Sequence, residues 1–513
     1  MIDLYHILRV RGLLMLVLAS ALSGSLIQAG QRVAAAGSAE PRTVRAVNLA
    51  AGPIRLKFAD GELRYLYVGD KEIIRRIYFS VRDTVWDTPS PRFTKVDVRS
   101  GADNFEVNLS AVVKQGAIDF TWNGKIVGAA DGQITYRVDG QANADFKCNR
   151  FGFCVLYGSA SMEEQRFEMT DDKGGTSESV FPKRIPPGIW PHSFRSLRYV
   201  TASGMEVVTS LTPVLFGLED QRNWSDSSFK AFSAMDYPYP NIVKGATGTE
   251  TVTVKILNPQ ATAAPAGPVR VTIGAPVKGA RLPKLIPLDS EARKGFFLDV
   301  TTHRDQYRQA ATVTWPFTPA VNLFDDDTLI ENLPTLRDQA ETARTFAPFA
   351  VFRVAPLRFN PYWERPNRDP RNLKPFAAAW LASAVKYLAM GGVAEVMPDV
   401  GPAYAELLQK RLVSHEGAGI LSVTVEGPPR PIVDALAIED GADIVVWLAN
   451  LSDDSQKDIE LNLPSARNIR LGRINETTKL DADLPMKVLG TARSQLRLDL
   501  APYEVREIKA SSK

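Results

Sequence analysis

Cysteine and histidine are scarce in this sequence of 513 residues, which holds 2 Cys and 4 His. Zinc sites and thiol nucleophiles depend on these two residue types. Beyond the first 36 residues the histidines are His192, His303 and His415, which are far apart and lack the spacing of metal ligands. The sequence therefore predicts no metal site, no cofactor and no Cys/His nucleophile pair.

The two cysteines, Cys148 and Cys154, are close in sequence and flank Asn149–Phe153. A fully extended strand would hold them about 20 Å apart, too far for a bond. A turn would let them pair in an oxidising compartment. Both states, bonded and free, remain open at this point.

A strong excess of either charge is also missing, since the formal net charge is +3. Nucleic-acid binding requires a marked basic surface, so no nucleic-acid partner is expected. The apolar content of 45% and the charged content of 23% are typical of a soluble globular protein.

Long apolar runs are missing except near the N-terminus, where Arg9 and Arg11 precede Leu13–Leu18 and a series of small residues. This apolar core is too short to span a bilayer comfortably. We therefore interpret residues 1–36 as a cleaved export signal, with cleavage options near Ala29 or Ala36. The expected location is the periplasm or the exterior, without stable membrane insertion; a retained signal anchor is the alternative.

The fold class predicted is a multidomain α+β protein with three folded parts. Residues 45–258 contain alternating runs such as Leu63–Val68, Phe105–Leu109 and Val252–Ile256, separated by turn residues. Alternation with a period of two is typical of antiparallel strands that bury one face. This range is expected to form a large antiparallel β-sandwich.

Residues 259–268 are rich in Ala and Pro and are predicted to be a linker. From 269 to 425 short apolar runs of the buried-strand kind alternate with helical patterns, which indicates a partial β/α (TIM-like) barrel. The expected strands are Phe296–Val300, Ala311–Trp315, Ala350–Val354 and Val393–Val396. The expected helices are Asp325–Phe346, interrupted at Pro334, and Lys374–Met390, followed by Gly391.

This range is shorter than the roughly 200 to 250 residues of a complete eight-fold barrel. An incomplete barrel exposes strand edges, which another domain or a second copy of the chain, as a homodimer, must cover. After a second Pro-rich segment, residues 432–513 return to alternation, as in Ile444–Asn450. They are predicted to form a small C-terminal β-sandwich.

The stretch Glu219–Lys230 combines acids, cations, hydroxyls and aromatics between a strand-like run and a Tyr/Pro-rich run. Opening of an ester or lactone needs a base and a group that holds the oxyanion. Asp220 or Asp226 could be the base, and Arg222, Asn223 or Lys230 could face the oxyanion or a sugar carboxylate. The expected ligand contacts in this stretch are Glu219, Asn223, Trp224 and Lys230. The same residues also fit a structural loop with an internal Arg–Asp ion pair.

Two further groups are candidate ligand contacts. Asn149 and Arg150 precede Gly152 and could direct a guanidinium into a cleft. Arg82 is near Asp83 and Trp86, a set that fits either an ion pair or a sugar platform. In the β/α part the candidates at strand ends are Asp325, Asp326, Arg358, Asn360 and Asp399, although Asp325–Asp327 are better explained as helix caps.

Three stretches resemble the N-terminal domain of bacterial D-apionate lactonases. They are Gly61–Gly69 leading to Arg82–Trp86, then Asn149–Leu156, and Glu219–Asp226. The resemblance covers about residues 50–258 and resumes over Thr312–Val396. It implies a β-sandwich, a glycosidase-like β/α barrel and a terminal β-domain that act on the lactone of a branched sugar acid.

This chain differs from that family pattern in lacking the early barrel units and in carrying an apparent export signal. Glu395–Asp399 also stands where the family's last barrel strand would end in a carboxylate flanked by aromatics. The first predicted function is therefore an exported D-apionate lactonase-like protein that hydrolyses a sugar lactone or related ester. The alternatives are a non-catalytic carbohydrate-binding or assembly protein with a degenerate barrel, and a decayed enzyme without a ligand.

Overall fold

The computed structural model describes residues 46–188, 190, 193–235, 241–259, 267–288, 296–360, 369–427, 432–464, 467–480, 484–490 and 494–511. The predicted export signal lies outside the described residues, as does most of the predicted linker 259–268. Within the described ranges, no helix has both the length and the apolar character needed to cross a membrane.

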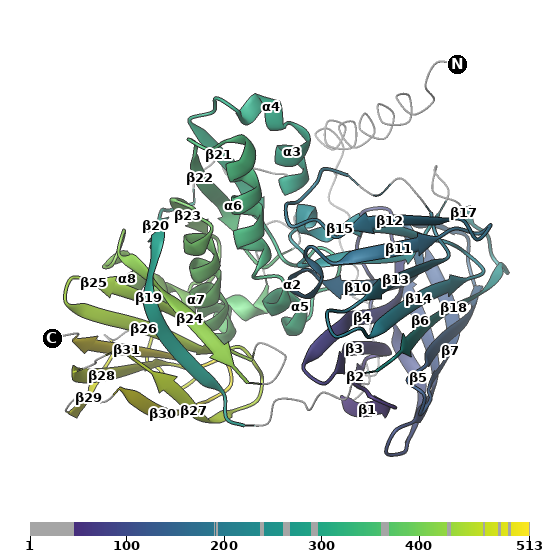
Figure 1. Cartoon of the computed structure of the whole chain (residues 1–513), viewed down its shortest axis with the longest axis horizontal. Coiled ribbons are helices and arrows are strands. Elements are labelled where there is room, and N and C mark those ends of the chain that lie inside the picture. The colour runs from purple at the N-terminus through teal and green to yellow at the C-terminus, as the bar shows by residue number, and fades with distance from the viewer. Residues whose placement is uncertain are drawn as a thin grey trace. The chain divides into compact units, whose positions relative to one another are not determined.

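The N-terminal part is a large antiparallel β-sandwich, as predicted (Figure 1). Its first sheet has seven strands in the order β1 (Val47–Ala51), β2 (Ile54–Ala59), β3 (Glu62–Val68), β4 (Lys71–Arg82), β10 (Arg150–Gly158), β16 (Ser228–Ser233) and β15 (Phe216–Asp220). The second has nine in the order β12 (Thr176–Val180), β11 (Arg166–Thr170), β13 (Ser196–Val200), β14 (Glu206–Thr212), β18 (Thr247–Leu257), β8 (Ile134–Ala142), β7 (Ile118–Gly128), β6 (Phe105–Gln115) and β5 (Arg92–Ser100). Two short strands of the same part, β9 (Phe146–Lys147) and β17 (Asn241–Ile242), form a separate antiparallel pair.

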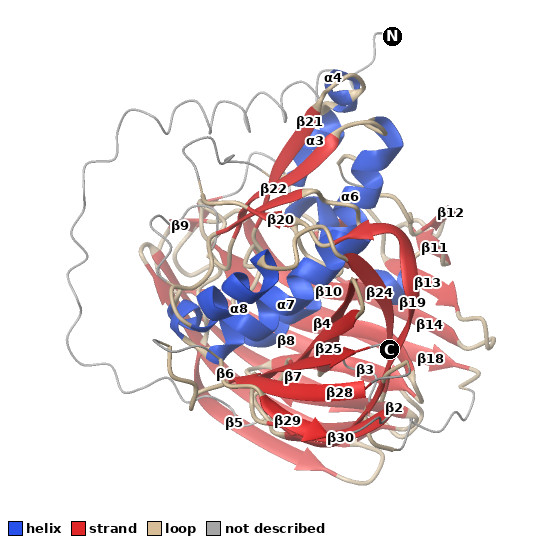
Figure 2. Cartoon of the chain, turned by 90° about the vertical axis from the view of Figure 1, so that its left-hand side faces the viewer, coloured by secondary structure: helices blue, strands red, loops and turns tan. Residues whose placement is uncertain are grey.

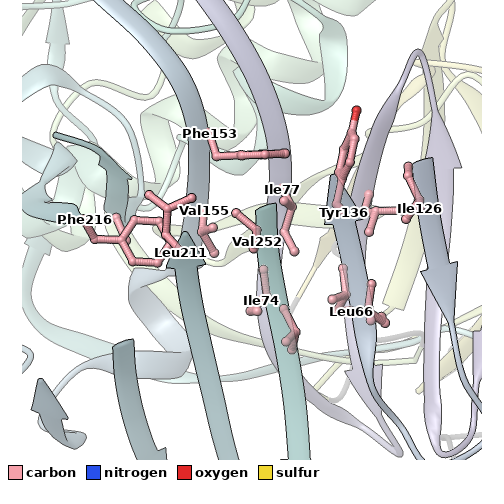
Figure 3. Close-up of a cluster of buried hydrophobic side chains, with 14 of the residues drawn as sticks. Leu66, Ile74, Ile77, Ile126, Tyr136, Phe153, Val155, Leu211, Phe216 and Val252 are labelled. Carbon is pink, nitrogen blue, oxygen red and sulfur yellow. The ribbon is translucent and has the colours of Figure 1, made fainter. Parts of the chain in front are cut away.

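The alternation read from the sequence becomes alternating burial along these strands. In β6 and β7 nearly every second side chain is buried, and those between are partly exposed. Figure 3 shows the buried side chains, with Ile77 and Phe153 from the first sheet and Tyr136 and Val252 from the second. Each large apolar side chain buried in this way contributes about 1.5–3 kcal/mol.

The middle part is a partial barrel of four parallel strands with helices around it, whereas the sandwich is almost all strand (Figure 2). The strand order is β20 (Lys284–Leu285), β23 (Glu395–Pro398), β22 (Val351–Leu357) and β21 (Thr312–Phe317). The helical elements of this part are α3 (Phe297–Thr302), α4 (Arg304–Tyr307), α5 (Asp326–Glu331), α6 (Thr335–Phe346), η2 (Pro370–Leu373), α7 (Pro375–Met390) and α8 (Tyr404–Val413).

One strand prediction in this part is wrong, because Phe296–Val300 forms the start of helix α3 and its N-cap. A short apolar run does not distinguish a buried strand from a buried helix. The interruption at Pro334 is confirmed, since α5 ends at Glu331 and α6 begins at Thr335.

Helix α7 is the central helix of the middle part. Pro375 occupies its first turn, where a missing N–H is tolerated. Its Ala-rich sequence is buried on nearly every side, as expected for a helix packed between other elements. Trp380 fixes it to α5 by donating its indole N–H to the carbonyl of Leu329 at 2.9 Å.

The C-terminal strands form a nine-stranded sheet with its own apolar core, the predicted small β-sandwich. The order is β29 (Lys487–Gly490), β28 (Arg467–Ile474), β31 (Val505–Ser511), β26 (Asp443–Asn450), β25 (Val433–Asp440), β24 (Gly419–Glu426), β19 (Arg270–Arg281), β27 (Gln456–Asn462) and β30 (Gln495–Leu500). Strands β19 and β24, whose residues lie within 269–425, pair with each other and join this sheet.

The two cysteines are both buried and not bonded to each other. Cys154 lies inside β10, and Cys148 precedes that strand by two residues. The segment between them is therefore largely extended, the geometry that prevents a bond.

The sandwich contacts the middle part through charged side chains at the N-terminus of α5. Asp325 caps this helix by accepting from the backbone N–H of Thr328 at 3.1 Å, which confirms the predicted capping role. The same carboxylate accepts from Arg64 at 2.8 Å and from Arg76 at 3.1 Å. A helix cap thus also connects two strands of the sandwich to the β/α part.

Candidate functional site

The stretch Glu219–Lys230 runs from the end of β15 through η1 (Gln221–Trp224) to the start of β16. Asp220 caps η1, since its Oδ1 accepts from the backbone N–H of Arg222 at 3.1 Å. Ser225 then adopts a left-handed φ of 67° and leads the chain into β16. The turn is tight, and its side chains point to three separate environments.

The first environment is a buried ion pair between Asp220 and Arg222. Nη2 of Arg222 lies 2.9 Å from Asp220 Oδ2, and Nε lies 3.0 Å from Oδ1. Nη1 lies 3.0 Å from Glu163 and 3.4 Å from Asp338 on α6, while Nη2 also donates to the carbonyl of Pro182. Both side chains of the pair are fully buried. These two candidates for catalysis therefore connect the sandwich to α6 through contacts with protein groups.

The second environment is the contact between η1 and α3. Asn223 donates to the carbonyl of Pro186 at 2.6 Å and accepts from Thr301 Oγ1 at 2.8 Å. The ring of Trp224 meets Phe296 edge-to-face, with centroids 4.9 Å apart. Asn223 and Trp224, which the sequence suggests as ligand contacts, hold this helix in place.

The third environment is the face of the first sheet toward the β/α part, where four charged side chains gather. Strand pairing places Arg82 of β4 directly opposite Arg150 of β10, and Glu219 of β15 opposite Lys230 of β16. Glu219 Oε2 lies 3.9 Å from Lys230 Nζ and 4.0 Å from Arg150 Nη2. We call Arg82, Arg150, Glu219 and Lys230 the Lys230 cluster. It unites four of the residues singled out in the sequence.

Lys230 is buried within this cluster, with 3% of its side chain exposed. Its Nζ donates to Gln221 Oε1 at 2.7 Å and to Asn322 Oδ1 at 3.4 Å. Burial, together with the neighbouring charges of Arg82 and Arg150, lowers the pKa of Lys230 to about 7, although Glu219 acts in the opposite direction. Lys230 can therefore gain or lose its proton near neutral pH.

The two arginines keep donor capacity that no protein group uses in the described part of the chain. Arg82 donates to Asn322 Oδ1 and, at 3.0 Å, to the hydroxyl of Tyr78. Arg150 lies over the ring of Phe232, 3.6 Å from its centroid. The Nε atoms of both arginines are buried without a hydrogen-bond partner among the described residues. A buried donor of this kind costs free energy unless something accepts from it.

Charge within the Lys230 cluster does not balance, because three cations face one carboxylate. Like charges directly opposite each other on neighbouring strands are unfavourable. Arg150 and Glu219 have 12% and 15% of their side chains exposed, so they are the members nearest to solvent. An anion that contacts Arg150 would supply the missing charge and acceptors.

Asp226 and Asn149 support this cluster from outside. Asp226 accepts from Ser228 Oγ at 2.6 Å and from the amide of Asn322 at 3.0 Å, and only 4% of it is exposed. Asn149 donates to the carbonyl of Thr84 at 2.9 Å and so fixes the loop after Arg82. In this structure both side chains are engaged with the protein.

Two family models match the chain in adjacent ranges. The model of the D-apionate lactonase N-terminal domain matches residues 33–259, and that of the D-apionate lactonase TIM barrel domain matches residues 293–437. The D-apionate lactonase of Brucella anthropi is 28% identical over 238 residues. The chain belongs to the D-apionate lactonase family. That alignment covers 44% of this chain and 38% of the relative, so less than half of the relative's length is matched.

Solved structures similar to this D-apionate lactonase family member include two glycoside hydrolases. The xyloglucanase of glycoside hydrolase family 44 from Paenibacillus polymyxa has a TM-score of 0.32 and 10% identity, over 43% of this chain and 52% of that one. CelM2, a bifunctional glucanase-xylanase from a metagenome library, has a TM-score of 0.31 and 12% identity, over 41% of this chain and 47% of that one.

Three residues around the Lys230 cluster were not among the site predictions for this family member. Gln221 bridges Lys230 and Glu219, accepting from the first at 2.7 Å and donating to the second at 2.8 Å. Tyr78 precedes Arg82 by four positions on β4, so alternation alone places the two on one face. Asn322 follows β21, where side chains after the strand reach the C-terminal end of the barrel sheet.

Proposed function

We propose that this chain hydrolyses a lactone of a sugar acid, with the Lys230 cluster as its working site. The observation that carries the proposal is the buried surplus of positive charge at Arg82, Arg150 and Lys230 beside the partly exposed Glu219. Membership of the D-apionate lactonase family supports this reaction class. The product of lactone opening is a carboxylate, which would add negative charge beside the three cations of the cluster.

The chemistry assigns separate roles to the carboxylate and the cations. Glu219 takes a proton from water as the water oxygen bonds to the lactone carbonyl carbon. Arg150 and protonated Lys230 stabilise the negative charge that develops on the carbonyl oxygen. The ring C–O bond then breaks, the leaving oxygen receives the proton from Glu219, and the hydroxy acid ionises to a carboxylate held by the arginines.

Acid release from aldonolactones, followed with a pH indicator, tests this reaction in the full chain. Lys230→Met is expected to lower kcat about a hundredfold, the usual cost of losing an oxyanion donor. The matched control is Lys125→Met, which removes an exposed lysine of β7 whose side chain is 54% exposed. If no aldonolactone is hydrolysed by the folded wild-type chain, the proposal is wrong.

The alternative function is binding of a sugar acid without turnover. One observation favours it: within the described residues, Glu219 is the only carboxylate in the cluster itself, and Asp226 is occupied by Ser228 and Asn322. Under this alternative D-gluconate stabilises the chain against heat, Lys230→Met abolishes the stabilisation, and no lactone is consumed.

Two further expectations from the sequence remain proposals. The N-terminal segment 1–36 supports export, which fractionation of cells producing the full chain would test. The edge position of β21 in its sheet supports pairing of two copies across that edge. Light scattering that gives the mass of one chain would contradict the pairing.

A further inference from the structure

A pocket separate from the Lys230 cluster opens where the three folded parts meet. It has a volume of about 370 Å³, near the lower end of the range for small-molecule sites. Its lining includes Tyr67 and Glu72 of the sandwich, Glu331 at the end of α5, Tyr387 of α7 and Asp434 of β25. Glu72 and Arg82 stand at opposite ends of β4, about 30 Å apart along the strand.

Hydrogen bonding in this pocket is incomplete. Glu72 is 8% exposed, and its Oε1 lies 3.2 Å from Arg75 Nη2 in an ion pair but has no hydrogen bond among the described residues. The Nε of Arg75 is likewise buried without a partner there. Only Oε2 of Glu72 is satisfied, by the hydroxyl of Tyr67 at 3.1 Å. An acceptor and a donor, both buried, thus remain without a hydrogen bond among the described residues in two side chains that line the pocket.

The chain beside this pair has a glycine, Gly158, where a side chain would not fit. A Cβ added at Gly158 would lie 2.2 Å from Glu72 Oε1 and 2.4 Å from Arg75 Nη2. The space that glycine leaves is therefore the space that the Glu72–Arg75 pair occupies. The pair is built into the wall of the pocket and is not a flexible surface ion pair.

The charges of the lining identify the class of ligand. Asp434 is neutralised by Lys386, whose Nζ lies 2.6 Å from its Oδ2. Three other carboxylates in the lining, Asp70, Glu72 and Glu331, remain beside two cations, Lys71 and Arg75. An ionised carboxylate only accepts and a guanidinium only donates, so the ligand must do both. Hydroxyl groups do so without adding charge.

The remaining lining is apolar and aromatic. Tyr65, Tyr67 and Tyr387 present rings, and Ile330 and Leu333 add aliphatic surface. The hydroxyl of Tyr65 is already held by Glu331, which leaves its ring as the usable surface. A ring with polar edges and a C–H face matches this combination.

We propose that this pocket binds a neutral monosaccharide, with Glu72 and Arg75 hydrogen-bonded to neighbouring hydroxyls and the tyrosine rings against the sugar face. The site is independent of the proposed lactone hydrolysis. It gives the chain a second carbohydrate contact at the junction of its three parts.

Thermal unfolding of the full chain with D-xylose and D-glucose tests the proposal, with D-gluconate as an anionic probe and methylammonium as a cationic one. At least one neutral sugar is expected to raise Tm with a saturable dose dependence. Glu72→Gln should raise the half-saturating concentration at least about tenfold, since it loses a charge-assisted hydrogen bond. Glu106→Gln, the same change at a partly exposed residue of β6, should leave this concentration unaltered.

The two sites are separated by comparing probes. Lys230→Met should leave the sugar response intact, and Glu72→Gln should leave any gluconate response intact. If Glu72→Gln does not fold, Tyr67→Phe removes the hydroxyl at Glu72 Oε2, and crystals of the wild-type chain soaked in xylose show directly where the sugar lies. Absence of a saturable response to both sugars, equal loss in Lys230→Met, or a response to methylammonium alone would each overturn the proposal.

Discussion

Arg222 and Asp220 form a two-point ion pair in which Nη2 and Nε lie 2.9 and 3.0 Å from the two carboxylate oxygens, and both side chains are fully buried. Burial raises the pKa of Asp220 even though Arg222 opposes the change. The pair depends on both charges being present, because either one alone would be a buried charge without compensation. Variants of this pair should therefore change the free energy of unfolding of the chain and not a catalytic step.

Arg222→Ala should lower the free energy of unfolding by about 3–5 kcal/mol, the usual cost of breaking a buried ion pair. Urea unfolding at neutral pH measures this. Arg137→Ala is the control, because Arg137 pairs with Asp139 on the surface with about half of each side chain exposed. Its loss should have a far smaller effect, because solvent screens an exposed ion pair. Equal effects of the two variants would refute the bracing role of Arg222.

Asp325→Ala should lower the free energy of unfolding by about 1–3 kcal/mol, because it removes the cap of α5 and partners of Arg64 and Arg76. The carboxylate is 34% exposed, so solvent screens part of the effect.

The same residue should make stability depend on acid. Burial acts to raise the pKa of Asp325, but Arg76 and Arg64 overcome it and hold the pKa well below its ordinary value of 3.8. The unfolded chain therefore takes up this proton at a higher pH than the folded chain does. The contribution is complete above the ordinary value and is lost as pH falls toward the folded value. Asp97→Asn at the exposed Arg99 pair should show a much smaller effect.

The regular parts of this fold could be predicted because their signals are local. Alternation along β6 predicts which side chains are buried, and Pro334 predicts a helix break. Helix α3 could not be predicted, since its position depends on contacts with η1, such as Thr301 with Asn223.

The candidate site was predicted only in part for the same physical reason. Lys230, Arg82 and Arg150 were named from their chemistry, but strand pairing decides that they meet. Asp338 and Arg222 are 116 positions apart in the chain, and no local pattern connects them. Asn322 contacts both Arg82 and Lys230 from another part of the fold. Such long-range partners decide whether an Asp–Arg motif braces the fold or faces a ligand.

Lys230 should give the free energy of unfolding a pH dependence of the same sign as Asp325 does, but at neutral to alkaline pH. Burial, Arg82 and Arg150 lower its pKa from 10.5 to about 7. Between these values the unfolded chain holds the proton more strongly, so the free energy of unfolding should rise with pH. Urea unfolding across this range should show a steeper rise for the wild type than for Lys230→Met, with Lys125→Met as control. Identical slopes in wild type and Lys230→Met would show that Lys230 keeps an ordinary pKa.

Glu219→Gln separates the proposed base from a purely structural carboxylate. The amide keeps an oxygen that can accept from Gln221, now 2.8 Å away, but it cannot take a proton from water. If Glu219 is the base, kcat for an aldonolactone should fall about 10²–10⁴-fold while KM changes little. Loss of the negative charge should also lower the pKa of Lys230 further, because Glu219 is a neighbour that acts to raise it.

The pH profile then identifies the role of Glu219. The fall in kcat/KM of the wild type as Lys230 loses its proton near pH 7 should move to lower pH in Glu219→Gln, measured on the residual activity. Glu178→Gln on β12, where Glu178 faces Glu168 on β11, is a distant control that should alter neither rate nor profile. A variant with reduced kcat, unchanged Tm and an unshifted profile would show that Glu219 does not interact with Lys230 during the reaction. A variant with full kcat would assign the base to another group.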